Sequence, residues 1–127
     1  MTAYSGGRQF EWKCRDNLRS EGYEVIRSAG SKSKVDLMAL KLGQLLLVQC
    51  KRDGTIGPTE WNRLVELAGW VGAIPILAVN GPRGYGVDYW RLTGPKQRGK
   101  PMAAQPAERF LTDEVAGPVR QEWVEIP

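Results

Sequence analysis

Residues 27–51 read RSAGSKSKVDLMALKLGQLLLVQCK, and this stretch decides the fold. Its two apolar runs, 35–41 and 44–51, are separated only by Leu42 and Gly43, a spacing typical of a two-residue β-hairpin turn. Both runs are apolar on both faces, which indicates a sheet that is covered on its two sides. The stretch therefore predicts a hairpin buried inside an α/β domain.

The segments around the hairpin complete an α/β pattern. Apolar residues recur at helical spacing in two segments, and three more short apolar runs are typical of strands. The expected order is α-β-β-β-α-β-β, with a central mixed five-stranded sheet flanked by helices. The expected helices are 5–22 and 58–72, and the further strands are 23–28, 74–80 and 87–92.

The chain changes character after Thr93, because five of its eight prolines fall in the last 35 residues. We therefore expect a core domain at 1–92 and a proline-rich extension at 93–127. The extension is expected to pack on the same domain or on a dimer partner. Within it, residues 108–117 are expected to form one short helix.

Composition limits the class of protein and the chemistry. The 127 residues, 42% hydrophobic and 25% charged, predict one globular domain. The sequence has no run that could span a membrane and no signal-peptide core at its start, so a cytoplasmic location is expected. It contains no histidine, which excludes Ser-His-Asp hydrolysis and histidine-based zinc sites. Any metal would be a hard cation held by oxygen, such as Mg²⁺ or Mn²⁺.

Positive charge is concentrated in the first part of the chain. Residues 1–92 hold 13 Lys and Arg against 9 Asp and Glu, whereas residues 93–127 hold five of each. The whole net charge of +4 therefore lies before Thr93. Such an excess suits a polyanionic partner such as nucleic acid.

A carboxylate, Asp36, stands inside the first apolar run of the hairpin. A two-residue turn would place Asp36 directly opposite Gln49, with Lys51 on the same face. One interpretation is a structural ion pair between Asp36 and Lys51. The other is a site for phosphodiester hydrolysis, in which carboxylate and amide oxygens hold a divalent cation and lysine stabilises negative charge. The spacing alone leaves both open.

The same stretch resembles a known nuclease family. RSAGSKSKVDLMAL followed by VQCK is similar to the core of the PD-(D/E)XK nuclease superfamily. With the helix GRQFEWKCRDNLRSEG before it and the IPILAV strand after it, residues 6–92 resemble the archaeal Holliday junction resolvases of the Hjc type. The resemblance implies a restriction-endonuclease-like core and a Mg²⁺-dependent endodeoxyribonuclease, with Mn²⁺ as a substitute. It further implies a DNA-associated homodimer that makes paired nicks in four-way junctions during recombination and repair.

The resemblance also implies roles for single residues. Asp36 is the central metal ligand, Glu11 completes the metal site, and the backbone carbonyl of Cys50 faces the metal. Gln49 occupies the second acidic position of the motif, where glutamate is usual, and this change is expected to weaken metal binding. Lys51 is the catalytic lysine of the motif.

The loop before Asp36 carries the implied contacts to DNA. Ser31 matches a serine that lies close to the scissile phosphate in the resolvases. Because the loop is one residue longer here, Ser33 competes for that role. The expected DNA-binding residues are Arg8, Arg27, Ser31, Lys32, Ser33, Lys34 and Arg52.

Two alternative functions remain open at this point. A related nicking, flap or restriction-like nuclease would keep the fold and change the substrate. A weakly catalytic protein that binds DNA junctions would result if Gln49 has removed metal-dependent activity.

Overall fold

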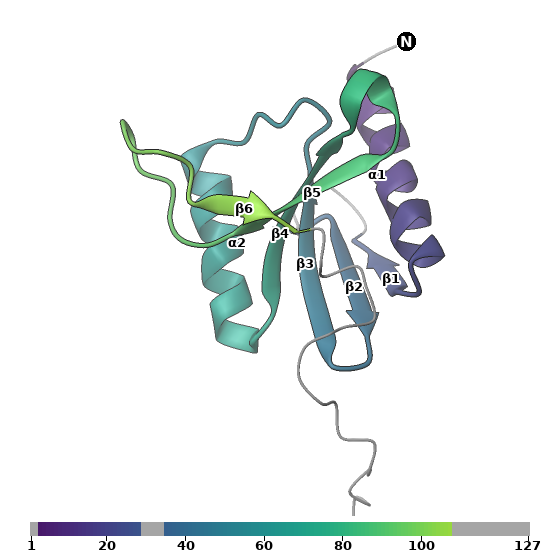
Figure 1. Cartoon of the computed structure of the whole chain (residues 1–127), viewed down its shortest axis with the longest axis horizontal. Helices are drawn as coiled ribbons and strands as arrows, with labels where there is room; N and C mark the ends of the chain where they lie inside the picture. The colour runs from purple at the N-terminus through teal and green to yellow at the C-terminus, as the bar shows by residue number, and fades with distance from the viewer. Residues whose placement is uncertain (1–2, 29–34, 108–127) are drawn as a thin grey trace, which may run out of the picture.

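A computed structural model of the chain describes residues 3–28 and 35–107 and shows one mixed sheet with helices against it (Figure 1). The α/β class is confirmed, and apart from a short 3-10 turn after the fourth strand the expected order α-β-β-β-α-β-β is confirmed as well. In the described part of the chain, no helix is long and apolar enough to cross a membrane. The expected helix at 108–117 and four expected site residues, Ser31, Lys32, Ser33 and Lys34, lie outside the described residues.

The sheet has the strand order β1-β2-β3-β4-β5-β6, in which β3 and β4 are parallel and all other neighbours are antiparallel. The helices are α1 (Ala3–Ser20) and α2 (Pro58–Val71), with a short 3-10 turn, η1 (Pro82–Gly84). The strands are β1 (Glu24–Arg27), β2 (Leu37–Lys41), β3 (Gln44–Cys50), β4 (Ile74–Asn80), β5 (Val87–Leu92) and β6 (Ala104–Pro106).

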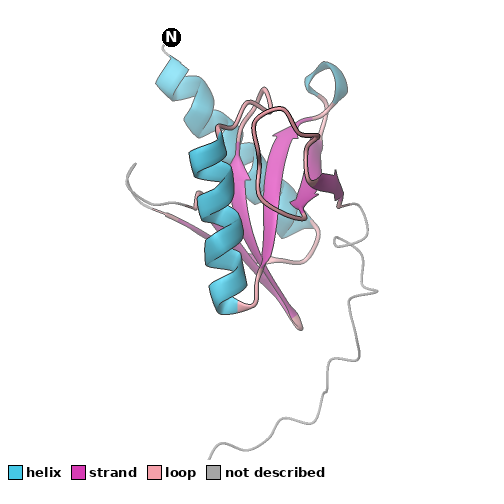
Figure 2. Ribbon diagram, turned by 90° about the vertical axis from the view of Figure 1, so that its left-hand side faces the viewer, coloured by secondary structure: helices cyan, strands magenta, loops and turns pink. Residues whose placement is uncertain are grey.

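The two helices cover opposite faces of the sheet, which explains why the hairpin strands are apolar on both sides. From α1, Phe10, Cys14 and Leu18 are buried in one core cluster, which includes Val48 of β3. From α2, Trp61 belongs to a second cluster that includes the next residue back along β3, Leu47. Figure 2 shows α2 in front of the sheet and α1 behind it.

The hairpin has the expected two-residue turn and register. Lys41 pairs with Gln44 across Leu42 and Gly43. Gly43 has φ 81°, a left-handed conformation that glycine adopts without steric cost. Along the hairpin Leu37 pairs with Val48, so a step of one residue further brings Asp36 opposite Gln49.

Parallel pairing of β3 with β4 brings the ends of two strands and of one helix to the same edge of the sheet. Leu46 pairs with Ile74 at the start of β4, and Cys50 pairs with Ala78 near its end. The crossover between them is α2, so the carboxyl ends of both strands and the amino end of α2 lie at the same edge (the top in Figure 1). Polar residues at the end of β3 are thereby brought close to the first turn of α2.

The five-strand expectation was one strand short. Residues 104–106 form β6, which pairs with β5, and Thr93 N–H donates to the Ala103 carbonyl at 2.6 Å. In the segment between Thr93 and Ala103, the Gly94 carbonyl accepts a hydrogen bond from Trp61 Nε1 at 2.7 Å. The sequence gives little sign of β6 because it has three residues and ends in proline, which is compatible only with an edge strand.

Candidate active site at the carboxyl end of β3

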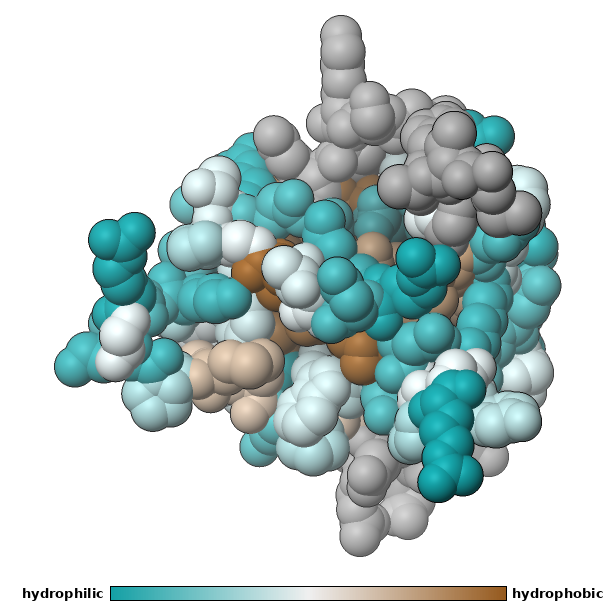
Figure 3. Space-filling model, turned by 90° about the horizontal axis from the view of Figure 1, so that it is seen from above, coloured by the Kyte–Doolittle hydropathy of each residue, from teal (hydrophilic) through white to brown (hydrophobic). Residues whose placement is uncertain are grey.

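The candidate site lies where the hairpin opens, at the edge that Figure 3 shows from above. Hydrophilic residues cover most of this face, and a few hydrophobic ones show between them. Asp36 comes from the segment just before β2, Gln49 and Cys50 end β3, and Lys51 follows directly. The fold therefore brings the residues of the expected motif to one edge.

Asp36 is held in place by the end of β3. Its backbone N–H donates to the Val48 carbonyl at 3.1 Å, and its Oδ2 accepts the Cys50 N–H at 2.8 Å. Burial raises the pKa of the Asp36 carboxyl, the Cys50 N–H opposes that rise, and the negative charges of Glu11 and Glu60 add to it. A nearby cation would therefore stabilise the charged form of the Asp36 carboxyl.

Gln49 is buried beside Asp36 and is only partly satisfied. Its side-chain Nε2 donates to Glu60 Oε2 at a long 3.4 Å. Among the described residues, its Oε1 is the buried side-chain polar atom without a hydrogen-bond partner. Such an atom costs about 1–3 kcal/mol. The oxygen is therefore available to a ligand.

Lys51 does not make the ion pair with Asp36 that the structural interpretation expected. Its Nζ lies 2.8 Å from Glu60 Oε2. Lys51 still belongs to the site, because its charge lowers the pKa of Asp36. The ammonium group is therefore paired with Glu60 and acts on Asp36 only through its charge.

Glu60 is the residue of the site that sequence reasoning missed. It lies in the first turn of α2, where it contacts both Gln49 and Lys51. A signal was present, because a helix that follows a parallel strand begins at the carboxyl end of that strand. The first turn of 58–72 could therefore have been searched for a carboxylate.

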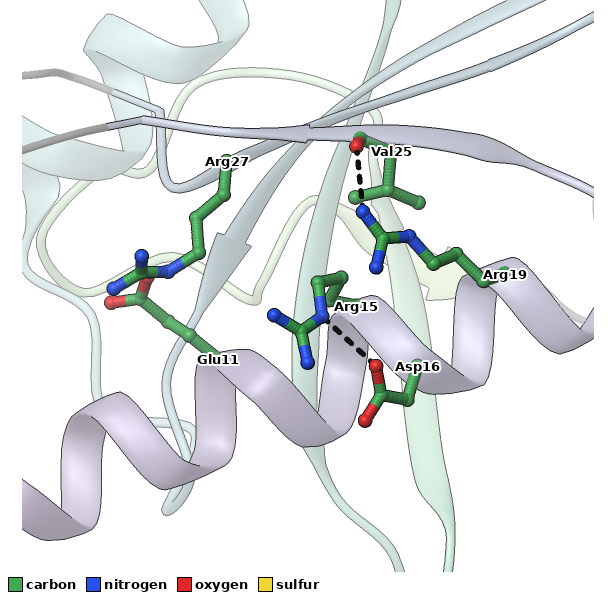
Figure 4. Close-up of polar contacts among 6 residues, drawn as sticks. All are labelled: Glu11, Arg15, Asp16, Arg19, Val25 and Arg27. Atoms are coloured by element: carbon green, nitrogen blue, oxygen red, sulfur yellow. Dashed lines mark hydrogen bonds and ion pairs between the residues drawn. The ribbon is translucent and has the colours of Figure 1, made fainter.

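Glu11 approaches from the other side of the sheet, on α1. Its Oε1 lies 3.3 Å from Arg27 Nε, and Figure 4 shows the two side chains facing each other. Its charge contributes to the raised pKa of Asp36, so it lies within electrostatic range of the site. Arg27, expected to contact DNA, thus also holds the carboxylate of Glu11.

The cysteine thiol at the end of β3 has no reactive character. A hydrogen bond with Cys14 and then burial raise the pKa of Cys50 well above the usual range, so its thiol stays protonated. The backbone of Cys50 is the part that serves the site, through its N–H to Asp36.

Three of the expected DNA contacts lie on the described surface. Arg8 on α1, Arg27 on β1 and Arg52 after β3 are all exposed. Arg52 follows the site directly in the chain, so it lies at the same edge. The remaining expected contacts, at 31–34, fall outside the described residues.

The side chains of the site offer oxygen donors to a divalent cation. No three His, Cys, Asp or Glu side chains in the described segments converge as a ready metal-binding group. The unpartnered Gln49 oxygen beside Asp36 nevertheless suits a hard cation, because carboxylate and amide oxygens are its preferred ligands. The residues present therefore fit a divalent metal, with fewer carboxylates on the hairpin than such a site usually has.

Comparison with known proteins gives a family and a fold. The family described as archaeal Holliday junction resolvase (Hjc) matches residues 2–100. The chain is 36% identical over 80 residues to crossover junction endodeoxyribonuclease Hjc of Methanocaldococcus jannaschii, an alignment that covers 60% of this chain and 59% of that protein. The 1.6 Å structure of Hjc from Archaeoglobus fulgidus, a Holliday junction resolvase, matches with a TM-score of 0.60. That match covers 81% of this chain and 85% of the other at 22% identity, which shows the fold.

Proposed function

Because the chain belongs to the archaeal Holliday junction resolvase family, we propose that it is a metal-dependent endodeoxyribonuclease that resolves four-way DNA junctions by paired nicks. The observation that supports this best is the open end of the β2–β3 hairpin, where Asp36 and Gln49 face each other and Lys51 follows. Membership of a resolvase nuclease family implies a divalent metal. The all-oxygen donor set favours Mg²⁺, with Mn²⁺ as a substitute.

In this proposal the residues of the site have two different roles. Asp36, Gln49, Glu11 and the Cys50 carbonyl are the metal ligands. The bound cation supplies the positive charge that polarises the scissile phosphate and activates water. Lys51 stabilises the negative charge that develops on the phosphate, because its ammonium already lies at the edge of the site.

The proposed contacts to DNA are to phosphate groups. Phosphate contacts position a nucleic acid without reading its base sequence, which suits an enzyme that selects a branched shape. Ser31 is proposed to lie closest to the scissile phosphate, with Ser33 as the alternative. The full proposed set is Arg8, Arg27, Ser31, Lys32, Ser33, Lys34 and Arg52.

Paired nicks require two active sites, and one chain holds one, so we propose a homodimer. We also propose a nuclease core at 1–92 and an extension at 93–127. Two features support an extension that begins on the same domain: β6 pairs with β5, and Ala107 is buried in the α1-side core cluster.

The test is cleavage of a labelled four-way junction and of a linear duplex with the same sequence, in Mg²⁺ and then in Mn²⁺. We expect paired nicks in the junction, none in the duplex, and no cleavage in EDTA. Cleavage of both substrates at equal rates would contradict junction selectivity and would favour a nicking or restriction-like nuclease.

Gln49 favours a second candidate, a junction-binding protein with weak catalysis. An uncharged amide replaces a carboxylate at the second acidic position, so the hairpin alone offers the cation less charge. Tight junction binding without cleavage, in Mn²⁺ as well as in Mg²⁺, would support this candidate.

A further inference from the structure

The side-chain amide of Gln49 has a defined orientation at the site. Its Nε2 points to Glu60 Oε2 at 3.4 Å, and its Oε1 has no partner among the described residues. Exchanging the two amide atoms would turn an oxygen toward a carboxylate oxygen, which is repulsive. Gln49 is 8% exposed, so its oxygen is a nearly buried acceptor that takes a hydrogen-bond donor or a cation as its partner.

We propose that Glu60, from the first turn of α2, is an acidic metal ligand that supplies the carboxylate Gln49 lacks. The inference rests on the proposed function, because it assigns a ligand to the same metal site. It places the second acidic group of the site on a helix and leaves the amide oxygen of Gln49 as a neutral ligand.

The charges in contact at the site favour such a group. The charges of Glu11 and Arg27 offset each other in their ion pair, at 3.3 Å. The charges of Glu60 and Lys51 offset each other likewise, at 2.8 Å. Asp36 then leaves these five residues with one net negative charge for a divalent cation, whereas without Glu60 they would have none.

The position of Glu60 allows it to reach a cation. Within the described part of the chain, its contacts to Gln49 Nε2 and Lys51 Nζ both use Oε2. The side chain is 49% exposed, so ions reach it from solvent.

The register of the hairpin also relates Glu60 to the central carboxylate. Glu60 contacts Gln49, and Gln49 lies opposite Asp36 across the hairpin. A cation bound between Asp36 and Glu60 would offset the charges of both carboxylates. The negative charge of Glu60 also explains its ion pair with Lys51, because this carboxylate attracts a cation from its surroundings.

The experiment measures Mn²⁺ binding to the full chain without DNA, by electron paramagnetic resonance of free Mn²⁺. Four proteins are compared with wild type: Glu60→Gln, Asp36→Asn, the exchange variant Gln49→Glu/Glu60→Gln, and Glu66→Gln. Glu66 is the matched control, because it lies on α2 with 51% side-chain exposure and pairs with Arg63 instead of the site. Circular dichroism melts verify that each variant folds.

We expect Glu60→Gln to weaken Mn²⁺ binding by about tenfold or more, because the charge of the ligands sets the affinity for hard cations. The exchange variant should regain most of the affinity, and Glu66→Gln should bind as wild type does. If Glu60→Gln binds Mn²⁺ as tightly as wild type and Asp36→Asn does not, the proposal is overturned and the metal site of the proposed function stands. Slower junction cleavage by Glu60→Gln at unchanged Mn²⁺ affinity would also overturn it, because Glu60 would then only position Lys51.

Failure of the proposed function gives a different result. In that case wild type and Asp36→Asn would show the same Mn²⁺ binding, or none. Both the metal site and the role of Glu60 would then be wrong.

Discussion

The two ends of the β2–β3 hairpin share one ladder of backbone hydrogen bonds but bury different kinds of side chain. Toward the closed end, β2 and β3 pair across the Leu42–Gly43 turn, and Leu46 is buried against the α1 face. At the open end the same register brings a carboxylate, Asp36, beside a buried amide, Gln49. Burying polar groups without partners costs stability, whereas burying leucine adds to it. The hairpin therefore stabilises the fold at its closed end and gives up stability at its open end, where the cation site is proposed.

The open end also collects one carboxylate from each helix. Glu11 comes from α1 with Arg27 as its partner, and Glu60 comes from α2 with Lys51 as its partner. A site of this kind depends on both faces of the sheet. Substitutions at the two ends of the hairpin should therefore separate activity from stability.

The largest effect is expected for Lys51→Met, which removes the ammonium at the open end. Junction cleavage should slow by about 10²–10³-fold, since such donors stabilise charge in the transition state. Stability should change by less than about 1 kcal/mol, because the pair with Glu60 is partly exposed. Single-turnover rates measure this, with Lys41→Met at the closed end as the control. Equal losses in both variants would contradict the assignment.

Leu46→Ala tests the closed end of the hairpin, where we expect a loss of stability. Leu46 is 1% exposed, and truncating such a leucine typically costs about 2–5 kcal/mol of unfolding free energy. Leu40→Ala, at a position that is 36% exposed on the neighbouring strand, should cost far less. Urea denaturation compares the two, and a similar cost for both would show that the hairpin is not buried as described.

Gln49→Glu should strengthen metal binding at the open end. The added charge should lower the Mg²⁺ concentration that gives half-maximal cleavage by about tenfold, because ligand charge sets the affinity for hard cations. Gln44→Glu at the closed end should leave the Mg²⁺ dependence unchanged. A higher Mg²⁺ requirement in Gln49→Glu would mean that Gln49 does not face the metal.

The smallest effect is a gain in stability for metal-free Asp36→Asn. Burial raises the pKa of Asp36 above 3.8, so the unfolded chain releases this proton at lower pH than the folded one. The wild type should therefore lose stability relative to Asp36→Asn as the pH rises above that value. The asparagine oxygen can still accept the Cys50 N–H. Thermal melts in EDTA between pH 4 and 8 test the sign, and a wild type that is the more stable protein at pH 7 would contradict it.

The sequence predicted what local spacing controls. Two residues between apolar runs were enough to set the hairpin register, and with it the pairing of Asp36 with Gln49. Apolar periodicity located both helices to within two residues. These features depend on contacts between near neighbours in the chain.

What the sequence did not predict depends on packing between distant segments. Glu60 lies 24 positions after Asp36 in the chain, and only the parallel crossover brings it to the open end. Lys51 turned to that carboxylate, so the ion pair suggested by strand spacing did not form. β6 was missed because a strand of three residues has no periodicity to detect.

Mapping the nicks that wild type and Asp36→Asn make in a labelled four-way junction tests the central claim most directly. With Mg²⁺ the wild type should cut two strands at symmetric positions. Asp36→Asn should bind the junction in EDTA with wild-type affinity and cut neither strand in Mg²⁺. Paired nicks by Asp36→Asn at the wild-type rate would show that the open end of the hairpin is not the active site.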